Sequence, residues 1–328
     1  MKPYFSIIIP YHNSAGTIGR LLASIQRSPK APAYEVIVVD DGSQEKYNGY
    51  NGYKNYKSYI RILRLNKNHG PAVARNRGVA AARGKIVVFV DSDVELFPDA
   101  LANLAKIYQD DPDIVAVTGV WVKEQRTNAF FPNYKAMRDW SYWINERDKS
   151  GYYFLFSTRI ASIKKSVFQR LGGFDETYPS PLVEDIELTY RIARRYAIIF
   201  APNVRVRHEF EPFWPVAKKY FLRAYYWTKL YARRKKFDPV ATTWWEALTT
   251  ISGVGVVLFF PFSLIGQIGQ IGLICFLLFH LFLTRKFLLF MVREKGIVFA
   301  IKGFFTGLIL YCFIFTGAVA GRLKYNSY

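Results

Sequence analysis

The sequence predicts an α/β fold: a mostly parallel sheet with helices on both faces, followed by an interfacial amphipathic helix and transmembrane helices. Through about the first 210 residues, short apolar runs suited to buried strands alternate with segments of helical periodicity. Two of these runs end directly in paired acids, at 40–41 and at 91–93. Further on, the chain has no charged residue from Ile251 to Leu283. The alternation predicts the sheet, the paired acids mark one edge of it, and the uncharged run indicates a membrane anchor.

The predicted strands and helices follow one another along the first part of the chain. An amphipathic helix with apolar positions Ile18, Leu21, Leu22 and Ile25 follows Asn13, and a helix of small residues covers 70–83. The apolar and alternating runs predict strands at 4–9, 34–39, 60–65, 85–90, 114–118 and 203–207, and further helices near 98–109 and over 186–196. This alternation is typical of a parallel sheet with helices packed on it.

The paired acids follow two of the predicted strands. Asp40 and Asp41 come after the strand at 34–39, and Asp91 and Asp93 come after the strand at 85–90. Ligands of open parallel sheets bind beyond the carboxyl ends of the strands, so both pairs should face one pocket. Two acidic pairs in one pocket of a chain with net charge +20 need a cation between them. A divalent metal carrying a nucleotide diphosphate satisfies this, because hard cations bind carboxylates and phosphates together.

The C-terminal part has the composition of a membrane anchor. The uncharged run 251–283 exceeds a single span of about 20 residues, and the run 297–321 contains only Lys302 as a charge. Pro261 and the segment 266–270 fit either a hairpin of two short passes or one long kinked helix, so we expect two to three spans. The two cysteines, Cys275 and Cys312, lie in these apolar runs, which excludes a disulfide framework in the soluble part.

The segment 213–237 has an aromatic face and a basic face at helical spacing and ends in the basic run 233–236. A solvated helix packed on the soluble domain and a nucleic-acid-binding patch are alternative interpretations. The spanning segments that follow favour a helix in the membrane interface, where each basic side chain contributes about 1 kcal/mol near anionic headgroups. We therefore expect a membrane partner, no nucleic acid, and a cytoplasmic soluble domain by the positive-inside rule. The expected domains are 1–212, 213–248 and 249–328.

One segment departs from these patterns. Residues 46–59 carry tyrosines at a strict period of three among Asn, Gly and Lys, which neither a helix nor a strand has. We interpret this segment as a low-complexity surface loop; stacking on a sugar or lipid headgroup is the alternative.

Six motifs in order resemble family 2 glycosyltransferases with the GT-A fold, over residues 4 to about 210. They are Ser-Ile-Ile-Ile-Pro-Tyr-His-Asn (6–13), Val-Asp-Asp-Gly-Ser (39–43), Asn-His-Gly-Pro-Ala-Val-Ala-Arg-Asn (68–76), Asp-Ser-Asp (91–93), Gly-Gly-Phe-Asp-Glu (172–176) and Glu-Asp (184–185). The resemblance implies an inverting, metal-dependent transfer of a sugar from a nucleotide-diphosphate sugar, with UDP as the expected nucleotide and GDP as the alternative.

The resemblance also implies roles for single residues. Asp93 would hold Mg²⁺ or Mn²⁺ with Asp91, which also reaches the ribose, and with His208, for which a structural role is equally open. Asp41 would bind the nucleotide base. Asp185 would be the catalytic base that deprotonates the acceptor hydroxyl, with Glu184 as a supporting acid. The other residues expected at the nucleotide sugar are Pro10, Tyr11, Asn13, Asp40, Lys67, Gly70, Arg75 and Ser92. Among them we expect Asp40 to orient the loop, and Lys67 and Arg75 to contact phosphate, with a surface charge as the alternative for each of these two.

Two departures from related classes narrow the expected function. The chain has Arg-Ala-Tyr-Tyr-Trp at 223–227 in place of the Gln-x-x-Arg-Trp of processive synthases, and Thr-Gly-Val-Trp at 118–121 in place of the Gly-Ser-Arg of polyprenyl-phosphate sugar synthases. We expect a single-addition transferase acting on a lipid-linked saccharide or another glycan acceptor at the membrane. A polyprenyl-phosphate glycosyl synthase and a non-catalytic membrane scaffold are the alternatives.

Overall fold

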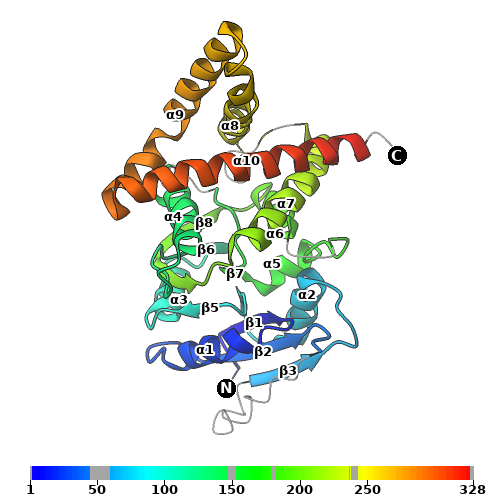
Figure 1. Ribbon diagram of the computed structural model, residues 1–328. Coiled ribbons are helices and arrows are strands. Elements are labelled where there is room, and N and C mark those ends of the chain that lie inside the picture. Colours follow the sequence, from blue (N-terminus) through cyan, green and yellow to red (C-terminus); the bar gives the residue numbers. More distant parts are fainter. Residues whose placement is uncertain are drawn as a thin grey trace. The chain divides into compact units, whose positions relative to one another are not determined.

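The computed structural model describes residues 2–44, 60–146, 153–178, 182–235, 237 and 243–325 of the chain (Figure 1). The chain forms two compact units. The first contains residues 1–124 and 149–209, and the second contains residues 125–148 and 210–328. The Tyr-rich segment 46–59, interpreted above as a surface loop, lies outside the described residues.

The first unit is built on one sheet of eight strands within the described residues, in the order β3-β2-β1-β4-β7-β6-β8-β5. The strands are β1 (Phe5–Tyr11), β2 (Tyr34–Asp40), β3 (Ile60–Arg64), β4 (Ile86–Val90), β5 (Val94–Leu96), β6 (Ala116–Trp121), β7 (Ile160–Lys164) and β8 (Ile198–His208). Strands β3, β2, β1 and β4 are parallel neighbours, whereas β7 is antiparallel to both β4 and β6. The sheet is therefore mixed, with the predicted parallel half intact.

The helices of this unit are α1 (Ala15–Gln26), α2 (Pro71–Ala81), α3 (Ala100–Asp110), α5 (Lys165–Arg170) and α6 (Glu184–Ala193). Helix α2 packs against β1 and β2, where the missing side chain of Gly78 makes room for Ile8. A Cβ at this glycine would lie 2.4 Å from Ile8 Cγ2. The parallel strands β1, β2 and β4 are buried almost throughout, as their apolar runs predict.

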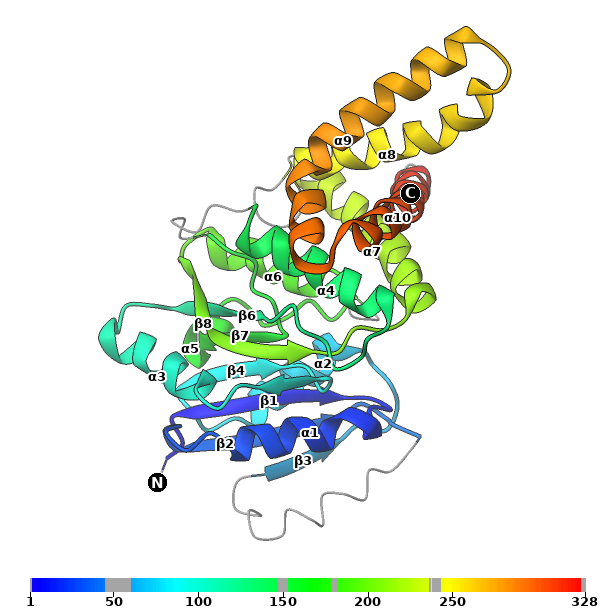
Figure 2. The same ribbon diagram turned by 60° about the vertical axis from the view of Figure 1, so that its left-hand side comes forward.

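The second unit is helical and contains the apolar segments. Its helices are α4 (Phe130–Ile144), α7 (Phe213–Arg234), α8 (Trp244–Ser263), α9 (Gln267–Lys295) and α10 (Ile297–Tyr325). A capping box between Thr243 and Glu246 begins α8. Trp140 of α4 stacks on Phe290 of α9 with ring centroids 5.4 Å apart. The helices α8 and α9 form a hairpin (Figure 2), so the first apolar run is two helices and not one kinked helix.

Three helices of this unit have the length and apolar composition to cross a membrane, among the described residues: Trp244–Ser263, Gln267–Lys295 and Ile297–Lys324. This confirms the expectation of apolar helices at the C-terminal end. Helix α4 belongs to the same compact unit as α7, α8, α9 and α10, although about 70 residues separate the end of α4 from the start of α7. The boundaries expected at 212 and 248 stay predictions.

Candidate active site

The loops that follow β1 and β2 bind each other at the carboxyl edge of the sheet. The His12 Nδ1 lies 2.8 Å from the Asp41 carbonyl oxygen, and the Asn13 amide donates to Ser43 Oγ at 3.0 Å. Asp40 Oδ1 accepts from the Ser43 amide at 2.9 Å, which turns the chain after β2. This contact fits the loop-orienting role that the sequence suggests for Asp40. Neither His12 nor Ser43 is among the predicted site residues, although both lie inside the quoted motifs.

Asp41 fixes the start of α2. The carboxylate is buried and accepts the backbone amides of His69 and Gly70, each at 2.8 Å. Gly42, with φ +66°, allows the chain at Lys67 to pass close by, since a Cβ there would lie 2.3 Å from the Lys67 carbonyl carbon. The structure therefore gives Asp41 a structural role, and its predicted contact with the nucleotide base stays a prediction. The Lys67 side chain is exposed, as phosphate binding requires.

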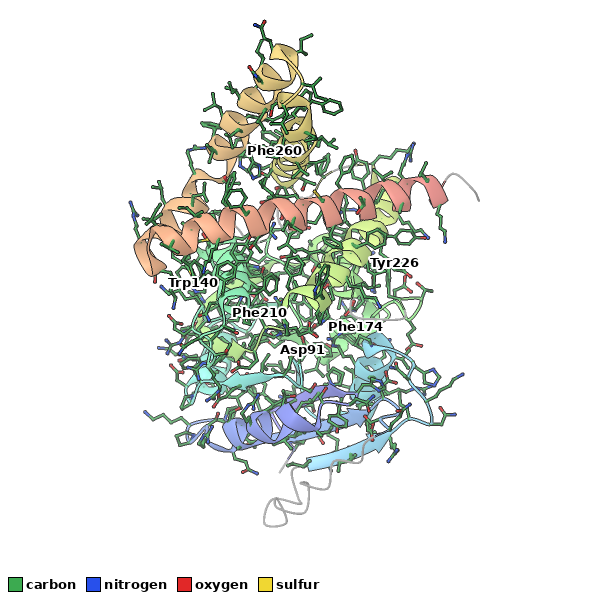
Figure 3. The ribbon with its side chains drawn as sticks, in the orientation of Figure 1. Asp91, Trp140, Phe174, Phe210, Tyr226 and Phe260 are labelled. Atoms are coloured by element: carbon green, nitrogen blue, oxygen red, sulfur yellow. The ribbon has the colours of Figure 1, made fainter. Side chains whose placement is uncertain are left out.

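A buried arginine joins three elements of the site. Arg75 Nη2 lies 2.8 Å from Asp91 Oδ1, and Arg75 Nη1 lies 2.9 Å from Glu184 Oε1. The side chains of Arg75 and Glu184 are 2% and 4% exposed, so both charges of this second pair are shielded from water. The Arg75 guanidinium also lies over the ring of Phe174, 5.5 Å from its centroid. Figure 3 labels Asp91 and Phe174, two of the residues that contact this arginine.

The two carboxylates keep Arg75 charged. Burial alone lowers the pKa of the guanidinium, but the charges of Asp91 and Glu184 and their hydrogen bonds outweigh it and leave the pKa above its usual value. Both terminal nitrogens are already bound to carboxylates. This favours a positioning role for Arg75 over the predicted contact with phosphate, and we take that role as our proposal.

The next residue, Asn76, attaches the Gly-Gly-Phe-Asp-Glu loop to α2. Its side-chain amide donates to the Phe174 carbonyl oxygen and to Glu176 Oε1, both at 2.9 Å. Its Oδ1 accepts from the Phe174 amide at 2.9 Å. The Ala-Arg-Asn segment of α2 therefore holds both the loop 172–176 and the N-terminus of α6 in place.

We expect Gly173→Ala to destabilise the protein more than Gly172→Ala does. Both glycines have positive φ, at +71° and +83°, but only Gly173 is crowded: a Cβ there would lie 2.6 Å from Asn76 Oδ1, whereas one at Gly172 meets nothing within 4 Å. The shared strain costs about 1–2 kcal/mol, and the clash adds to it only at Gly173. Urea unfolding of the two variants measures the difference, and equal losses would contradict the role of Asn76.

Glu184 and Asp185 lie at the N-terminus of α6. Glu184 Oε2 accepts from the Leu182 amide at 2.9 Å, so both oxygens of this acid have protein partners. Asp185 Oδ1 accepts from the Ile186 amide at 2.8 Å, and the residue is partly exposed. Acids at a helix N-terminus interact favourably with the helix dipole. The buried Glu184 supports the site, while the partly exposed Asp185 has the access that a catalytic base needs.

The strand pairing brings Asp93 next to His208. Val94 of β5 lies opposite His208 of β8 in the antiparallel register, and His208 Nε2 is 3.4 Å from Asp93 Oδ2. Among the described residues, no group of three or more His, Cys, Asp or Glu side chains is arranged to hold a metal ion. A carboxylate and an imidazole fit a divalent cation as two ligands, which leaves its other positions to phosphate oxygens and water. The pair therefore suits a metal that binds together with its nucleotide.

The remaining predicted site residues line the same edge. Pro10 and Tyr11 end β1, where the Pro10 side chain is half-buried and that of Tyr11 is 1% exposed. Gly70 precedes α2 with φ +93°, and Ser92 is half-buried between the two aspartates. These positions are compatible with a nucleotide at the strand ends. Direct contacts between predicted site residues include those of Gly70 with Asp41, of Arg75 with Asp91 and Glu184, and of Asp93 with His208.

The mixed sheet and the acids at its carboxyl edge define the class of GT-A folds. The chain belongs to glycosyltransferase family 2, because the model of that family, "Glycosyl transferase family 2", matches residues 6–172. The solved structure of the mannosyltransferase PcManGT from Pyrobaculum calidifontis, in complex with GDP-Man and Mn²⁺, is similar over 99% of this chain and 88% of that one, with a TM-score of 0.60 and 19% identity.

Curated relatives match this chain over only part of their own length. The succinoglycan biosynthesis protein ExoO of Rhizobium meliloti is 32% identical over 125 residues, which are 36% of this chain and 35% of that protein. The glucosyl-dolichyl phosphate glucuronosyltransferase of Haloferax volcanii is 27% identical over 150 residues, 43% of this chain and 46% of the relative. The chain thus spans less than half the length of these two relatives, and its family and fold are shown while its substrates are not.

Proposed function

We propose that the protein is a membrane-associated inverting glycosyltransferase that moves one sugar from a nucleotide-diphosphate sugar to a lipid-linked saccharide or glycan acceptor. The observation that carries this proposal is the bridge from Asp91 through Arg75 to Glu184. The bridge connects the Asp-Ser-Asp segment, which suits binding of the donor, to Glu184. Glu184 is the neighbour of Asp185, and Asp185 suits deprotonation of the acceptor. A binding scaffold has no need of such a link.

Each residue has a separate task in this reaction. Asp185 takes the proton from the acceptor hydroxyl as the hydroxyl attacks the anomeric carbon on the face opposite the diphosphate. Arg75 and Glu184 hold the start of α6, and with it Asp185, beside Asp91. Asp93 and His208 would hold a divalent cation, Mg²⁺ or Mn²⁺. When bound, such an ion neutralises the charge that develops on the leaving diphosphate.

The donor and the acceptor are further parts of the proposal. A UDP-sugar is the expected donor and a GDP-sugar the alternative; the relative that resembles this chain in fold was solved with GDP-Man. The relative from Haloferax volcanii is named for a lipid-linked sugar phosphate, which supports an acceptor held in a membrane. The candidate membrane helices support the same setting. The cytoplasmic side is our proposal for the first unit and rests on the positive-inside rule alone. Anchoring both partners in one membrane raises their effective concentration.

The experiment that tests the function is nucleotide release from a panel of UDP- and GDP-sugars by the detergent-solubilised protein. Each donor is offered with Mn²⁺, Mg²⁺ or EDTA, with and without a membrane lipid extract. Metal-dependent release of one nucleotide that rises with the extract is the expected result. Release that produces a one-sugar phosphodiester would instead identify a polyprenyl-phosphate synthase, and a folded protein that releases nothing from any donor would contradict the proposal.

We expect Asp93→Ala to abolish metal-dependent binding of the donor. The substitution removes one of the two protein ligands of the cation, and the nucleotide diphosphate then lacks its bridge to the sheet edge. Asp99→Ala is the matched control, because Asp99 is an acid of the same region whose side chain is 51% exposed and pairs with Arg205. Calorimetric titration of the donor with Mn²⁺ measures the effect, and an unchanged affinity of Asp93→Ala would refute the metal-binding role.

A further inference from the structure

Helix α10 packs directly on the backbone of the basic helix α7. A Cβ added to Gly317 would lie 2.2 Å from the Phe221 carbonyl oxygen, and one added to Gly321 would lie 2.5 Å from the Tyr225 carbonyl oxygen. Two glycines four residues apart allow such close approach of two helices. The C-terminal half of α10 is therefore held against a helix that carries several lysines and arginines.

Helix α4 covers the other half of α10. Tyr134 of α4 is buried against α10, with its hydroxyl 3.2 Å from where a Cβ of Gly307 would be. Helix α4 also carries the charged residues Lys135, Arg138 and Asp139. A charged side chain at the centre of a bilayer costs about 2.5–3.5 kcal/mol or more. Because charged helices lie along both of its halves, α10 fits a position in the headgroup region better than a position across the hydrocarbon core. The α8–α9 hairpin is then the part that enters the hydrocarbon core.

At the crossing of α4, α7 and α10, Arg138 is held by two tyrosines. Its Nη1 donates to the Tyr220 hydroxyl at 3.0 Å, and the guanidinium lies 5.3 Å from the ring centroid of Tyr220 and 5.2 Å from that of Tyr311. A guanidinium has five N–H donors. Within the described part of the chain, this bond is the only hydrogen bond of Arg138, and no carboxylate lies within ion-pair distance of it.

The acids around Arg138 have other partners. Lys135, one turn earlier on α4, binds the carboxylate of Asp139. Glu146, beyond the end of α4, accepts from Ser141 Oγ at 3.3 Å. The charge of Lys135 is thus compensated within the protein. Arg138 is a partly buried residue whose guanidinium is oriented by aromatic rings, and its other N–H groups have no hydrogen-bond partner among the described residues.

We propose that Arg138, with Tyr220 and Tyr311, binds a phosphate group of a membrane lipid at the headgroup level. A guanidinium suits phosphate because its planar donors form two parallel charge-assisted bonds with the phosphate oxygens. The hydroxyl of Tyr220 holds the guanidinium in orientation before the lipid arrives. That this lipid is the acceptor rests on the proposed function; the binding itself does not.

The test uses dodecyl phosphate as the probe and the detergent-solubilised full chain without any nucleotide sugar. Phosphorus NMR of mixed micelles follows the binding through the shift and broadening of the phosphate signal. Inorganic phosphate tests the same chemistry without a lipid chain, and dodecyl maltoside is the neutral reference. We expect saturable binding of dodecyl phosphate, at least about tenfold weaker in Arg138→Gln and partly retained in Arg138→Lys.

Arg322→Gln is the matched control, because Arg322 is an exposed arginine of α10 in the same basic unit. It removes an equal charge and should leave the affinity unchanged. Equal losses in Arg138→Gln and Arg322→Gln would show attraction by the overall charge and overturn the site, and so would equally tight binding of inorganic phosphate. Because no donor is present, nucleotide release can fail while this binding holds, and the binding can fail while release continues.

Discussion

Asp185→Asn should lose sugar transfer by at least about 100-fold while it binds the donor as well as the unaltered protein does. An amide has the size of the carboxylate, and its oxygen can still accept from the Ile186 amide, which lies 2.8 Å from Asp185 Oδ1. The structure at the start of α6 is therefore kept. What the amide cannot do is take the proton of the acceptor hydroxyl, so only the chemical step suffers.

Two measurements separate these effects: transfer of labelled sugar to acceptor, and calorimetric binding of the donor. Glu187→Gln is the matched control, because Glu187 lies in the first turn of the same helix and forms an ion pair with Arg191. It should transfer at nearly the normal rate. Normal turnover of Asp185→Asn would remove Asp185 as the base, and loss of donor binding in that variant would assign it to the donor side instead.

The parallel half of the sheet could be predicted because burial on both faces requires continuous apolar runs. Strand β4 is an example, as Ile86–Val90 is buried at every residue and lies inside the predicted range 85–90. Where such a strand ends, polar residues must begin, so the apolar run alone is enough to predict Asp91 at the edge of the sheet. The GT-A fold that the motifs imply is confirmed.

Other elements leave too little signal in the sequence. Strand β5 has only three residues, Val94–Leu96, which is too short to show a period of two. Helix α4 is absent from the predicted elements because its residues 131–137 are buried without a break, which gives no helical period, and two of them, Asn133 and Lys135, are polar. The helix is buried because Phe131, Tyr134 and Met137 pack in one cluster with residues of α7, α9 and α10, which no local pattern contains.

The contacts between distant segments are the least predictable part of the site. Arg75 and Glu184 are 109 residues apart, and nothing in either motif shows that one binds the other. The motifs predict both residues at the pocket edge, but they assign Arg75 to the phosphates. Similarly, His208 joins Asp93 only through the register of β5 with β8, and β5 is not among the predicted strands.

The Arg75 bridge leads to the largest expected loss of stability. Arg75→Leu leaves Glu184, which is 3% exposed, without the cation that compensates its charge. Removing one partner of a buried ion pair costs about 3–5 kcal/mol, mostly from the charge left behind. Urea unfolding of the solubilised chain, followed by tryptophan fluorescence, should show this loss. Arg27→Leu is the control: its side chain is 62% exposed, and its partner Glu95 keeps the ion pair with Arg207, so its loss should cost no more than about 1 kcal/mol.

A second substitution distinguishes a positioning role from a phosphate contact. In the double variant Arg75→Leu/Glu184→Gln, the buried charge of Glu184 is gone as well, so we expect part of the stability lost in Arg75→Leu to return. Transfer should stay low, because Asp91 and the start of α6 are still not held together, and a displacement of about 1 Å lowers rates by about 100-fold. If Arg75 instead bound the donor phosphates, Arg75→Leu would weaken donor binding strongly and leave stability nearly unchanged. The loss of donor affinity, compared with the loss of stability, therefore distinguishes a phosphate contact from a positioning role.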